Sequence, residues 1–282
     1  MIRRPAGFKH VDLITQNDHA RLAGELARHF GHPLFTTLSP ADQVIAGVSL
    51  HDSGWELHDR QPSLNAQGLP LHVFEVPVCV AVRVWGASVD QAMQAGDYAG
   101  LLVSLHVLNL SGLLLSHAFA SRSGSPDEAL SRSDQFEMNK FQHRQVEIQE
   151  MLRGRLGFET DTSRQLGLAD PGASSADDQL RFNFRVLTFL DRVSLNLCCG
   201  KNLFPLIDDV QPAPGEPPVT LTLKMPDDTT CVISPWPFSR SEIRLEVPAR
   251  RLRSDRWESA QVFQDAYAHA EEHQIPLLLK QG

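Results

Sequence analysis

A histidine and an aspartate stand side by side at the end of an apolar helical pattern, and this pair constrains the fold more than any other feature. In the stretch SPADQVIAGVSLHDSGW, residues 39–55, apolar positions recur at helical spacing and lead to His51 and Asp52. Ser39 is expected to cap this helix and Gly54 to end it, so that the pair lies at the helix C-terminus and faces inward. Burying an ionised carboxylate is costly unless it is paired or binds a cation. The fold must therefore bring a compensating group to Asp52.

A second carboxylate occupies the same kind of position much later in the chain. A helix is predicted downstream of the loop GLADPGASSADD, and one of its faces is otherwise apolar. The members of this face are Leu180, Phe184, Leu187, Asp191, Leu195 and Cys198. Asp191 is the only charged member of this face. Asp52 and Asp191 are thus two inward carboxylates on distant helices, and this predicts a site that they share.

Histidines on other predicted inward faces complete the candidate site. His19 lies on the apolar side of the helix predicted over residues 16–31, and His106 on that of a helix predicted over residues 98–119. His117 shares the face of His106 but lies about 16 Å further along, so the two cannot bind one ion. Imidazoles and carboxylates together form a mixed nitrogen and oxygen ligand set, which suits iron, manganese, zinc or nickel better than calcium. We therefore expect one or two divalent transition metal ions.

Two alternatives without a metal remain open. A single histidine on an apolar face is most often a hydrogen-bonded core residue. The carboxylates of Asp52 and Asp191 could also pair with Arg185, with Arg192 or with the histidines themselves in a closed polar network. A common metal centre is favoured because it satisfies all of these groups at once.

The overall composition excludes several classes of function. The chain has 282 residues, of which 42% are hydrophobic and 21% charged, and its formal net charge is −8. Such a molecule offers no broad field that would attract a nucleic acid polymer, and no run reaches the ~18 apolar residues of a membrane span. The four cysteines lack CxxC spacing, which favours reduced thiols and a cytoplasmic location. We therefore expect a small-molecule substrate and leave a homo-oligomer open.

The pattern of elements predicts a mainly α protein with a small antiparallel β appendage. Helical patterns dominate residues 10–210, and helix is also favoured over residues 76–85, where alternation resembles a strand. The proline-rich segment VQPAPGEPPVT leads into a β-rich part, residues 216–282, with strands at VTLTLKM, TTCVISPWPF and EIRLEVPAR. A strand predicted at residues 8–15 is free to join this appendage, and SAQVFQDAYAHAEEHQ is expected to be helical.

The order of the candidate ligands along the chain is similar to the H…HD…D signature of the HD-domain superfamily of metal-dependent phosphohydrolases. His19, the pair His51 and Asp52, and Asp191 follow one another on successive predicted helices. More closely, the whole chain resembles an uncharacterised bacterial family of HD-like proteins known as a domain of unknown function. The segments that carry this resemblance are QNDHARLAG, HDSGW, GLPLHVFE, SLH, DRVSLNLC and PWPF.

This resemblance implies an HD-domain-like helical bundle around a mono- or dinuclear metal centre. The implied ligands of the first ion are His19, His51, Asp52 and Asp191. Asp52 could bridge to a second ion, for which His72 and His106 would be the further ligands. The chain departs from the common pattern at Trp55, which stands where a lysine often follows the HD-x-G turn.

The resemblance also implies a reaction. The leading hypothesis is a hydrolase of a phosphoester or nucleotide-type small molecule, in which Asp52 and His106 move protons near a metal-activated water. The second is a dinuclear iron oxygenase of a small organic substrate, because some HD-fold proteins carry a similar ligand set. The third is a non-catalytic ligand-binding or regulatory protein.

Overall fold

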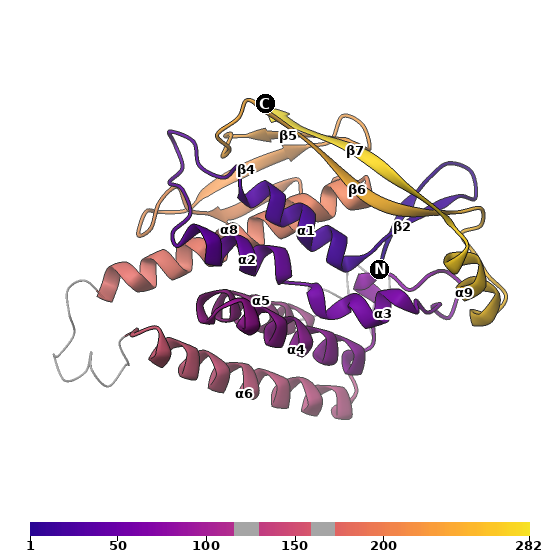
Figure 1. Ribbon diagram of the computed structural model, residues 1–282, viewed down its shortest axis with the longest axis horizontal. Helices are drawn as coiled ribbons and strands as arrows, with labels where there is room; N and C mark the ends of the chain where they lie inside the picture. Colours follow the sequence, from indigo (N-terminus) through magenta and orange to yellow (C-terminus); the bar gives the residue numbers. More distant parts are fainter. Residues whose placement is uncertain (116–129, 159–172) are drawn as a thin grey trace.

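The computed structural model describes residues 1–115, 130–158 and 173–282, and it shows a layer of strands packed against a stack of helices (Figure 1). The described helices are α1 (Gln16–Ala27), α2 (Ala41–Leu50), α3 (Glu56–Arg60), α4 (Val78–Ala95), α5 (Asp97–Leu115), α6 (Arg132–Arg155), α8 (Ala173–Cys199) and α9 (Ala260–Ala268), with the short 3-10 helices η1 (Ser53–Trp55) and η2 (Val73–Glu75). The described strands are β1 (Ile2–Pro5), β2 (Val11–Ile14), β3 (Leu206–Val210), β4 (Val219–Lys224), β5 (Thr230–Ser234), β6 (Glu242–Leu252) and β7 (Glu271–Gln281).

The described strands form one mixed sheet in the order β1-β2-β6-β7-β5-β4-β3. Neighbouring strands run antiparallel except β5 and β7, which pair in parallel with Cys231 opposite Leu279. The N-terminal strands extend the sheet beyond β6, because β2 pairs with β6 through Val11 and Leu252. The predicted strand near the N-terminus thus belongs to the same sheet as the C-terminal strands.

This sheet corrects the predicted fold class. The sequence predicts a mainly α, HD-like helical bundle with a small antiparallel β appendage, but the observed sheet is large, mixed and part of the main core. One continuous hydrophobic core contains Ile233 and Val247 of the sheet together with Leu26 of α1 and Phe189 and Leu190 of α8. α1, α2 and α8 therefore share their core with the sheet, while α4, α5 and α6 also form a second hydrophobic cluster among themselves. The helices as a whole are not a bundle in their own right.

The C-terminal strand β7 is the longest element that the sequence prediction lacks. It buries Ile275, Leu277 and Leu279, and this period of two is typical of a strand. The segment predicted as one helix up to residue 274 contains α9, which ends at Ala268, and then the start of β7. The prediction also lacks β1 and β3, which span four and five residues.

The positions of the helices agree with the prediction better than the residues that cap them do. α1 begins after Thr15, whose side chain accepts a hydrogen bond from the backbone of Asp18 and caps the helix. α2 begins after Pro40 without a side-chain cap, so Ser39 does not cap it. The alternating segment before Trp85 is the first half of α4, a helix as predicted.

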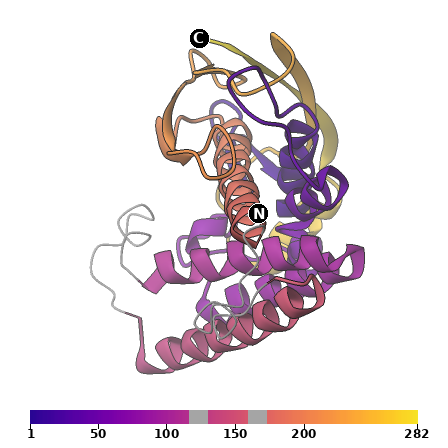
Figure 2. The same ribbon diagram turned by 90° about the vertical axis from the view of Figure 1, so that its left-hand side faces the viewer.

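α5 and α8 are the central helices of the molecule. α8 lies between the sheet and the lower helices α4, α5 and α6 in both views (Figures 1 and 2). α5 is long and apolar enough for a membrane span, but 56% of its most apolar window is buried inside the protein, where it packs against α2, α4, α6 and α8. The meeting point of α1, α2, α5 and α8 is where the candidate site lies.

Candidate metal centre

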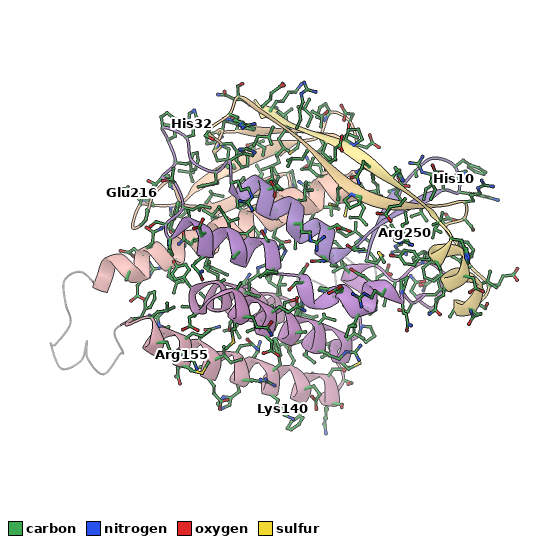
Figure 3. The ribbon with its side chains drawn as sticks, in the orientation of Figure 1. His10, His32, Lys140, Arg155, Glu216 and Arg250 are labelled. Carbon is green, nitrogen blue, oxygen red and sulfur yellow. The ribbon has the colours of Figure 1, made fainter. Side chains whose placement is uncertain are left out.

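Three histidines are almost fully buried in the middle of the protein. His19, His51 and His106 expose 0%, 1% and 1% of their surface, whereas His10 and His32 lie at the edge of the molecule (Figure 3). Buried imidazoles are normally paired with hydrogen-bonding groups or metal ions. The partners of these three side chains define the site.

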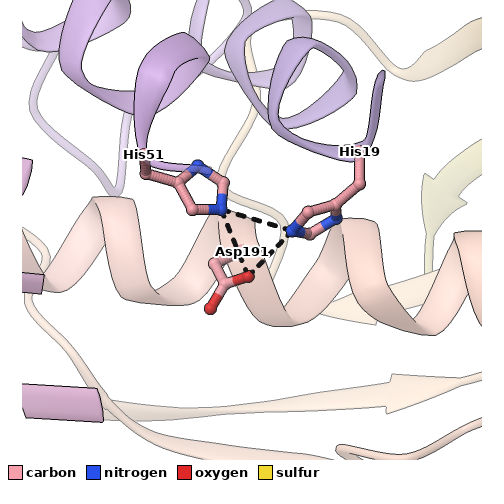
Figure 4. Close-up of side chains that lie close together, drawn as sticks. All are labelled: His19, His51 and Asp191. Atoms are coloured by element: carbon pink, nitrogen blue, oxygen red, sulfur yellow. Dashed lines mark hydrogen bonds and ion pairs between the residues drawn. The ribbon is translucent and has the colours of Figure 1, made fainter. Parts of the chain in front are cut away.

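His19, His51 and Asp191 bring three ligand atoms together (Figure 4). His19 lies on α1, His51 is the residue directly after α2, and Asp191 lies on α8. His19 Nε2 is 3.1 Å from Asp191 Oδ1 and 3.2 Å from His51 Nε2, and His51 Nε2 is 3.5 Å from Asp191 Oδ1. The structure thus joins three of the predicted ligands from three helices.

The far ring nitrogen of each histidine is fixed by a hydrogen bond. His51 Nδ1 lies 2.7 Å from the carbonyl oxygen of Val48, which can only accept, so Nδ1 carries the proton. This carbonyl is one of those left without a helical partner at the end of α2. His19 Nδ1 lies 3.0 Å from Ser194 Oγ, whose hydrogen is donated to the Asp191 carbonyl, so this Nδ1 also donates. In the neutral rings both Nε2 atoms therefore direct lone pairs at the shared site.

The geometry of the three facing atoms fits a transition metal ion. The two Nε2 lone pairs and the Asp191 oxygen are all acceptors, and they repel one another unless a cation lies between them. A point equidistant from three atoms at these separations lies about 1.9 Å from each, close to the ~2.0–2.2 Å of zinc–nitrogen and zinc–oxygen bonds. The buried cluster could therefore hold a metal ion.

The electrostatics of the cluster favour an added positive charge. Burial alone would lower the pKa of His51, but the carboxylates of Asp52 and Asp191 raise it to about 9. Burial alone would raise the pKa of Asp191, but the imidazoles of His19 and His51 hold it well below its usual value. A proton on His51 supplies the required charge in the absence of a metal, and a divalent cation would replace that proton.

Asp52 lies beside the three converging atoms. Its Oδ2 is 3.8 Å from His19 Nε2 and 3.7 Å from His51 Nε2, while its Oδ1 accepts a 3.2 Å hydrogen bond from the indole of Trp55. Burial raises the pKa of the Asp52 carboxyl group. From this position Asp52 could ligate the ion or hold a water molecule next to it.

His106, on α5, faces the second oxygen of Asp191. Its Nε2 is 3.8 Å from Asp191 Oδ2, and its ring lies edge-on to that of His51 with 5.1 Å between the ring centroids. Neither ring nitrogen has a hydrogen-bond partner among the described residues, and burial lowers the pKa of His106 to about 3. A neutral polar group buried without a partner costs about 1–3 kcal/mol. A second ion or an ordered water molecule bound here would remove that cost.

His72 is not brought to this cluster. It precedes η2, where its Nδ1 accepts a hydrogen bond from the backbone of Phe74. Burial, together with the positive charge of Arg3, lowers its pKa to about 3. Within the described ranges no contact joins His72 to the ligand cluster, so its placement does not favour the predicted role at a second ion. His117 lies outside the described residues.

Histidines, and not arginines, accompany the two carboxylates. No arginine or lysine of the described residues forms an ion pair with Asp52 or Asp191. Arg185 pairs with Asp209 at 3.5 Å, and Arg192 lies in the wall of a neighbouring cavity. The predicted alternative of neutralisation by these arginines therefore has no ion pair to support it.

A cavity of about 1010 Å³ adjoins the cluster. Asp52, His106 and Asp191 form part of its wall, and large apolar side chains such as Trp55 and Trp85 form another part. Cavities of roughly this size hold small-molecule ligands. The candidate metal ligands thus face a space large enough for a substrate.

Two residues of the site escape the sequence prediction. Ser194 orients His19, and Gln16 lines the cavity. Each stands three positions from a predicted ligand, Ser194 after Asp191 and Gln16 before His19, and positions three apart share a helix face. A polar residue one turn away from a buried ligand is the signal that would have found both.

Comparison with known proteins finds a matching family model. A family model described as Protein of unknown function (DUF3891) matches residues 1–254. No curated protein and no solved structure matches the chain. The family description names no reaction, so the function has to be inferred from the site.

Proposed function

This chain belongs to the DUF3891 family of proteins of unknown function, and we propose that it is a metal-dependent hydrolase of a phosphoester or nucleotide-type small molecule. One observation carries the proposal: the nitrogen atoms of His19 and His51 and an oxygen of Asp191 converge beside a substrate-sized cavity. We propose that they bind one or two divalent ions of iron, manganese, zinc or nickel.

Residues around the ion have distinct proposed roles. A divalent ion would lower the pKa of a coordinated water and neutralise charge that develops on a phosphoryl oxygen. Asp52 faces both imidazoles through Oδ2 and would accept a proton from the attacking water, while Trp55 fixes its other oxygen. His106 would hold a water molecule or a second ion against Asp191 Oδ2.

Arg192 is the cation that we propose for binding an anionic substrate. It follows Asp191 on α8 and lines the cavity, and its guanidinium carbon lies 5.8 Å from the ring centroid of Phe204. The described residues give it this ring contact and no carboxylate ion pair. A guanidinium without a carboxylate partner presents a planar set of donors that matches a phosphate group.

The order of the ligands supports the proposal, whereas the fold does not contribute to it. His19, the pair His51 and Asp52, and Asp191 follow the H…HD…D order of metal-dependent phosphohydrolases. Because the observed architecture is not an HD-like helical bundle, the likeness to that superfamily rests on these residues alone. The proposal therefore depends on the geometry of the ligand cluster.

Two experiments test the proposal. The first is element analysis of protein purified without added metal. The second is an assay with phosphoesters and nucleotides in the presence of iron, manganese, zinc or nickel. We expect one or two ions per chain and phosphate release that requires them. Asp191→Asn should abolish both, whereas His143→Gln, at an exposed histidine on α6, should change neither. Folded protein that binds no metal would refute the proposal, and metal-loaded protein without turnover would favour a non-catalytic ligand-binding role.

A dinuclear iron oxygenase of a small organic substrate is the second candidate. It is favoured by Asp191, whose two oxygens face different imidazoles, His19 and His51 on one side and His106 on the other. Two irons per chain and an absorption band that changes on exposure to dioxygen would support it. Turnover with zinc, which has no redox chemistry, would support the hydrolase instead.

We propose a small-molecule substrate, a cytoplasmic location and no nucleic acid polymer or membrane as partner. Cys79, Cys198, Cys199 and Cys231 are free thiols, and free thiols are usual in reducing compartments. Self-association, which the sequence leaves open, is measurable by sedimentation velocity.

A further inference from the structure

Gln16 is a fully buried side chain whose amide has no hydrogen-bond partner. It exposes 0% of its surface, and neither Nε2 nor Oε1 is hydrogen bonded to any described residue. Its backbone N–H, by contrast, donates to Asp59 Oδ2 at 2.6 Å. Because buried polar groups are nearly always paired, the free amide indicates a ligand or an ordered water molecule.

Gln16 differs in this respect from another buried glutamine. Gln211 also has an amide oxygen without a partner, but its Nε2 donates to the carbonyl of Glu216 at 2.7 Å. Gln16 leaves both its donor and its acceptor unused. A group that pairs with it fully must therefore offer an acceptor and a donor side by side.

The amide of Gln16 belongs to the cavity of the candidate metal centre. Gln16 lines the same cavity as Asp52 and His106. On α1 it precedes His19 by three residues, so that the two share a helix face and lie about 4.5 Å apart along the helix axis. A molecule held at the metal centre would therefore have its neighbouring atoms within reach of this amide.

We propose that Gln16 is a substrate-binding residue that recognises an amide-type group, an N–H next to a C=O, on the part of the substrate beside the reacting centre. Nε2 would donate to the carbonyl of the ligand and Oε1 would accept from its N–H. A phosphate or carboxylate offers only acceptors and would leave Oε1 unpaired, and an alkyl group would leave both atoms unpaired. The amide-type group is the one that satisfies Gln16 completely.

Other residues that line the cavity are apolar, and they indicate what kind of molecule carries the amide-type group. Trp55, Trp85 and Leu110 line the cavity with apolar surface. Large aromatic walls suit a flat, mainly apolar body. We therefore infer that the amide-type group is attached to a planar ring.

Benzamide is a probe with these features, and N,N-dimethylbenzamide is its counterpart without the N–H. We expect the full-length, metal-loaded protein to bind benzamide at least about ten-fold more tightly than the dimethyl compound, measured by calorimetry. Gln16→Leu and Gln16→Met should reduce this preference to less than about two-fold while the metal content stays unchanged. Gln61→Leu, at an exposed glutamine outside the cavity, is the matched control and should keep the preference.

The reacting centre named in this inference rests on the proposed hydrolase function, but the binding test does not require turnover. An inactive protein that still prefers benzamide through Gln16 would refute the hydrolase and support the inference. Equal binding of both probes by the wild-type protein, or an unchanged preference in folded Gln16→Leu and Gln16→Met, would refute the inference. A crystal structure with benzamide in which Gln16 contacts only ordered water would refute it as well.

Discussion

The proton on Nδ1 of His19 keeps Nε2 of the same ring free to bind a cation. Ser194 Oγ accepts the hydrogen bond of that Nδ1 at 3.0 Å, and the Val48 carbonyl plays the same part for His51 at 2.7 Å. Such partners behind a ligand fix its tautomer and its orientation. The serine hydroxyl, unlike the main-chain carbonyl, can be removed by substitution.

Ser194→Ala is expected to weaken metal binding by about 10–100-fold, because His19 would lose the acceptor that holds its Nδ1–H. Competition with a chelator measures the dissociation constant. Ser49→Ala is the control, since Ser49 Oγ also donates to a carbonyl of its own helix, that of Ile45, but supports no ligand. Equal losses in the two variants would contradict the orienting role of Ser194.

The raised pKa of His51 predicts how the stability of the metal-free protein depends on pH. The folded pKa is about 9, above the ~6.5 of an unfolded histidine. The stabilisation is therefore fully present below pH 6.5 and is lost as pH rises to 9, and its size is roughly 3 kcal/mol. His106, whose folded pKa is about 3, binds a proton only in the unfolded state near pH 6.5, and this contribution is common to the wild-type protein and a His51 variant.

The measurement is urea unfolding of the wild-type protein and His51→Gln in the presence of a chelator. The difference between their free energies of unfolding is expected to shrink steadily from pH 6.5 to 9. A difference that is constant over this range would show that His51 does not carry the proton of the metal-free cluster.

Among the elements, η1 packs closely against the backbone of α4. Its Gly54 was expected to let the chain turn away after α2, but the reason for this glycine is close packing against α4. A Cβ added there would lie 2.1 Å from the Val84 carbonyl oxygen and 2.5 Å from the Ser88 backbone nitrogen. The Gly54 N–H donates to Ser88 Oγ at 2.9 Å, so that η1, and Asp52 before it, are fixed to α4.

Gly54→Ala is therefore expected to destabilise the fold by about 1–3 kcal/mol or more, since backbone atoms of α4 would have to move. It should also weaken metal binding, because Asp52 would move with η1. Gly86→Ala on α4 is the control: a Cβ there meets nothing within 4 Å, and the change should stabilise the protein by about 0.5–1 kcal/mol. Urea unfolding of both variants measures the two effects, and a harmless Gly54→Ala would contradict the packing role.

Sequence reasoning found the helices in which apolar residues recur at helical spacing over several turns. The apolar stripes of α1, α2, α5 and α8 placed His19, His51, His106 and Asp191 on inward faces, and all four are buried. The sheet could not be found in this way, because its order depends on pairing between distant segments and periodicity carries no information about partners. The same limit explains His72: a histidine in a loop has no period that shows where its side chain points.

For the whole molecule, the sheet shares a core with α1, α2 and α8, and α4, α5 and α6 also form a cluster of their own. Ile14, Phe189 and Val247 belong to the same hydrophobic cluster, and β2 pairs with β6 across most of the length of the chain. The division into residues 10–210 and 216–282 stays a prediction, and the shared core gives a way to test it.

A chain cut after residue 214 is expected not to fold, because it would lose β4 to β7 and expose the side of α1 and α8 that those strands cover. Circular dichroism should show no cooperative thermal transition for it, in contrast to the full chain. A truncated protein that melts cooperatively and binds metal would establish an independent helical domain.

The ligands of the candidate centre lie far apart in the chain, since Asp191 follows His19 by 172 positions. During synthesis on a ribosome, the third ligand emerges only when most of the protein has been made, and it reaches the other two only after α8 has docked. An ion bound by this cluster would therefore be loaded late, through the cavity of an already assembled fold. The metal pool that the finished protein meets, and not the one around the nascent chain, would decide which element it carries.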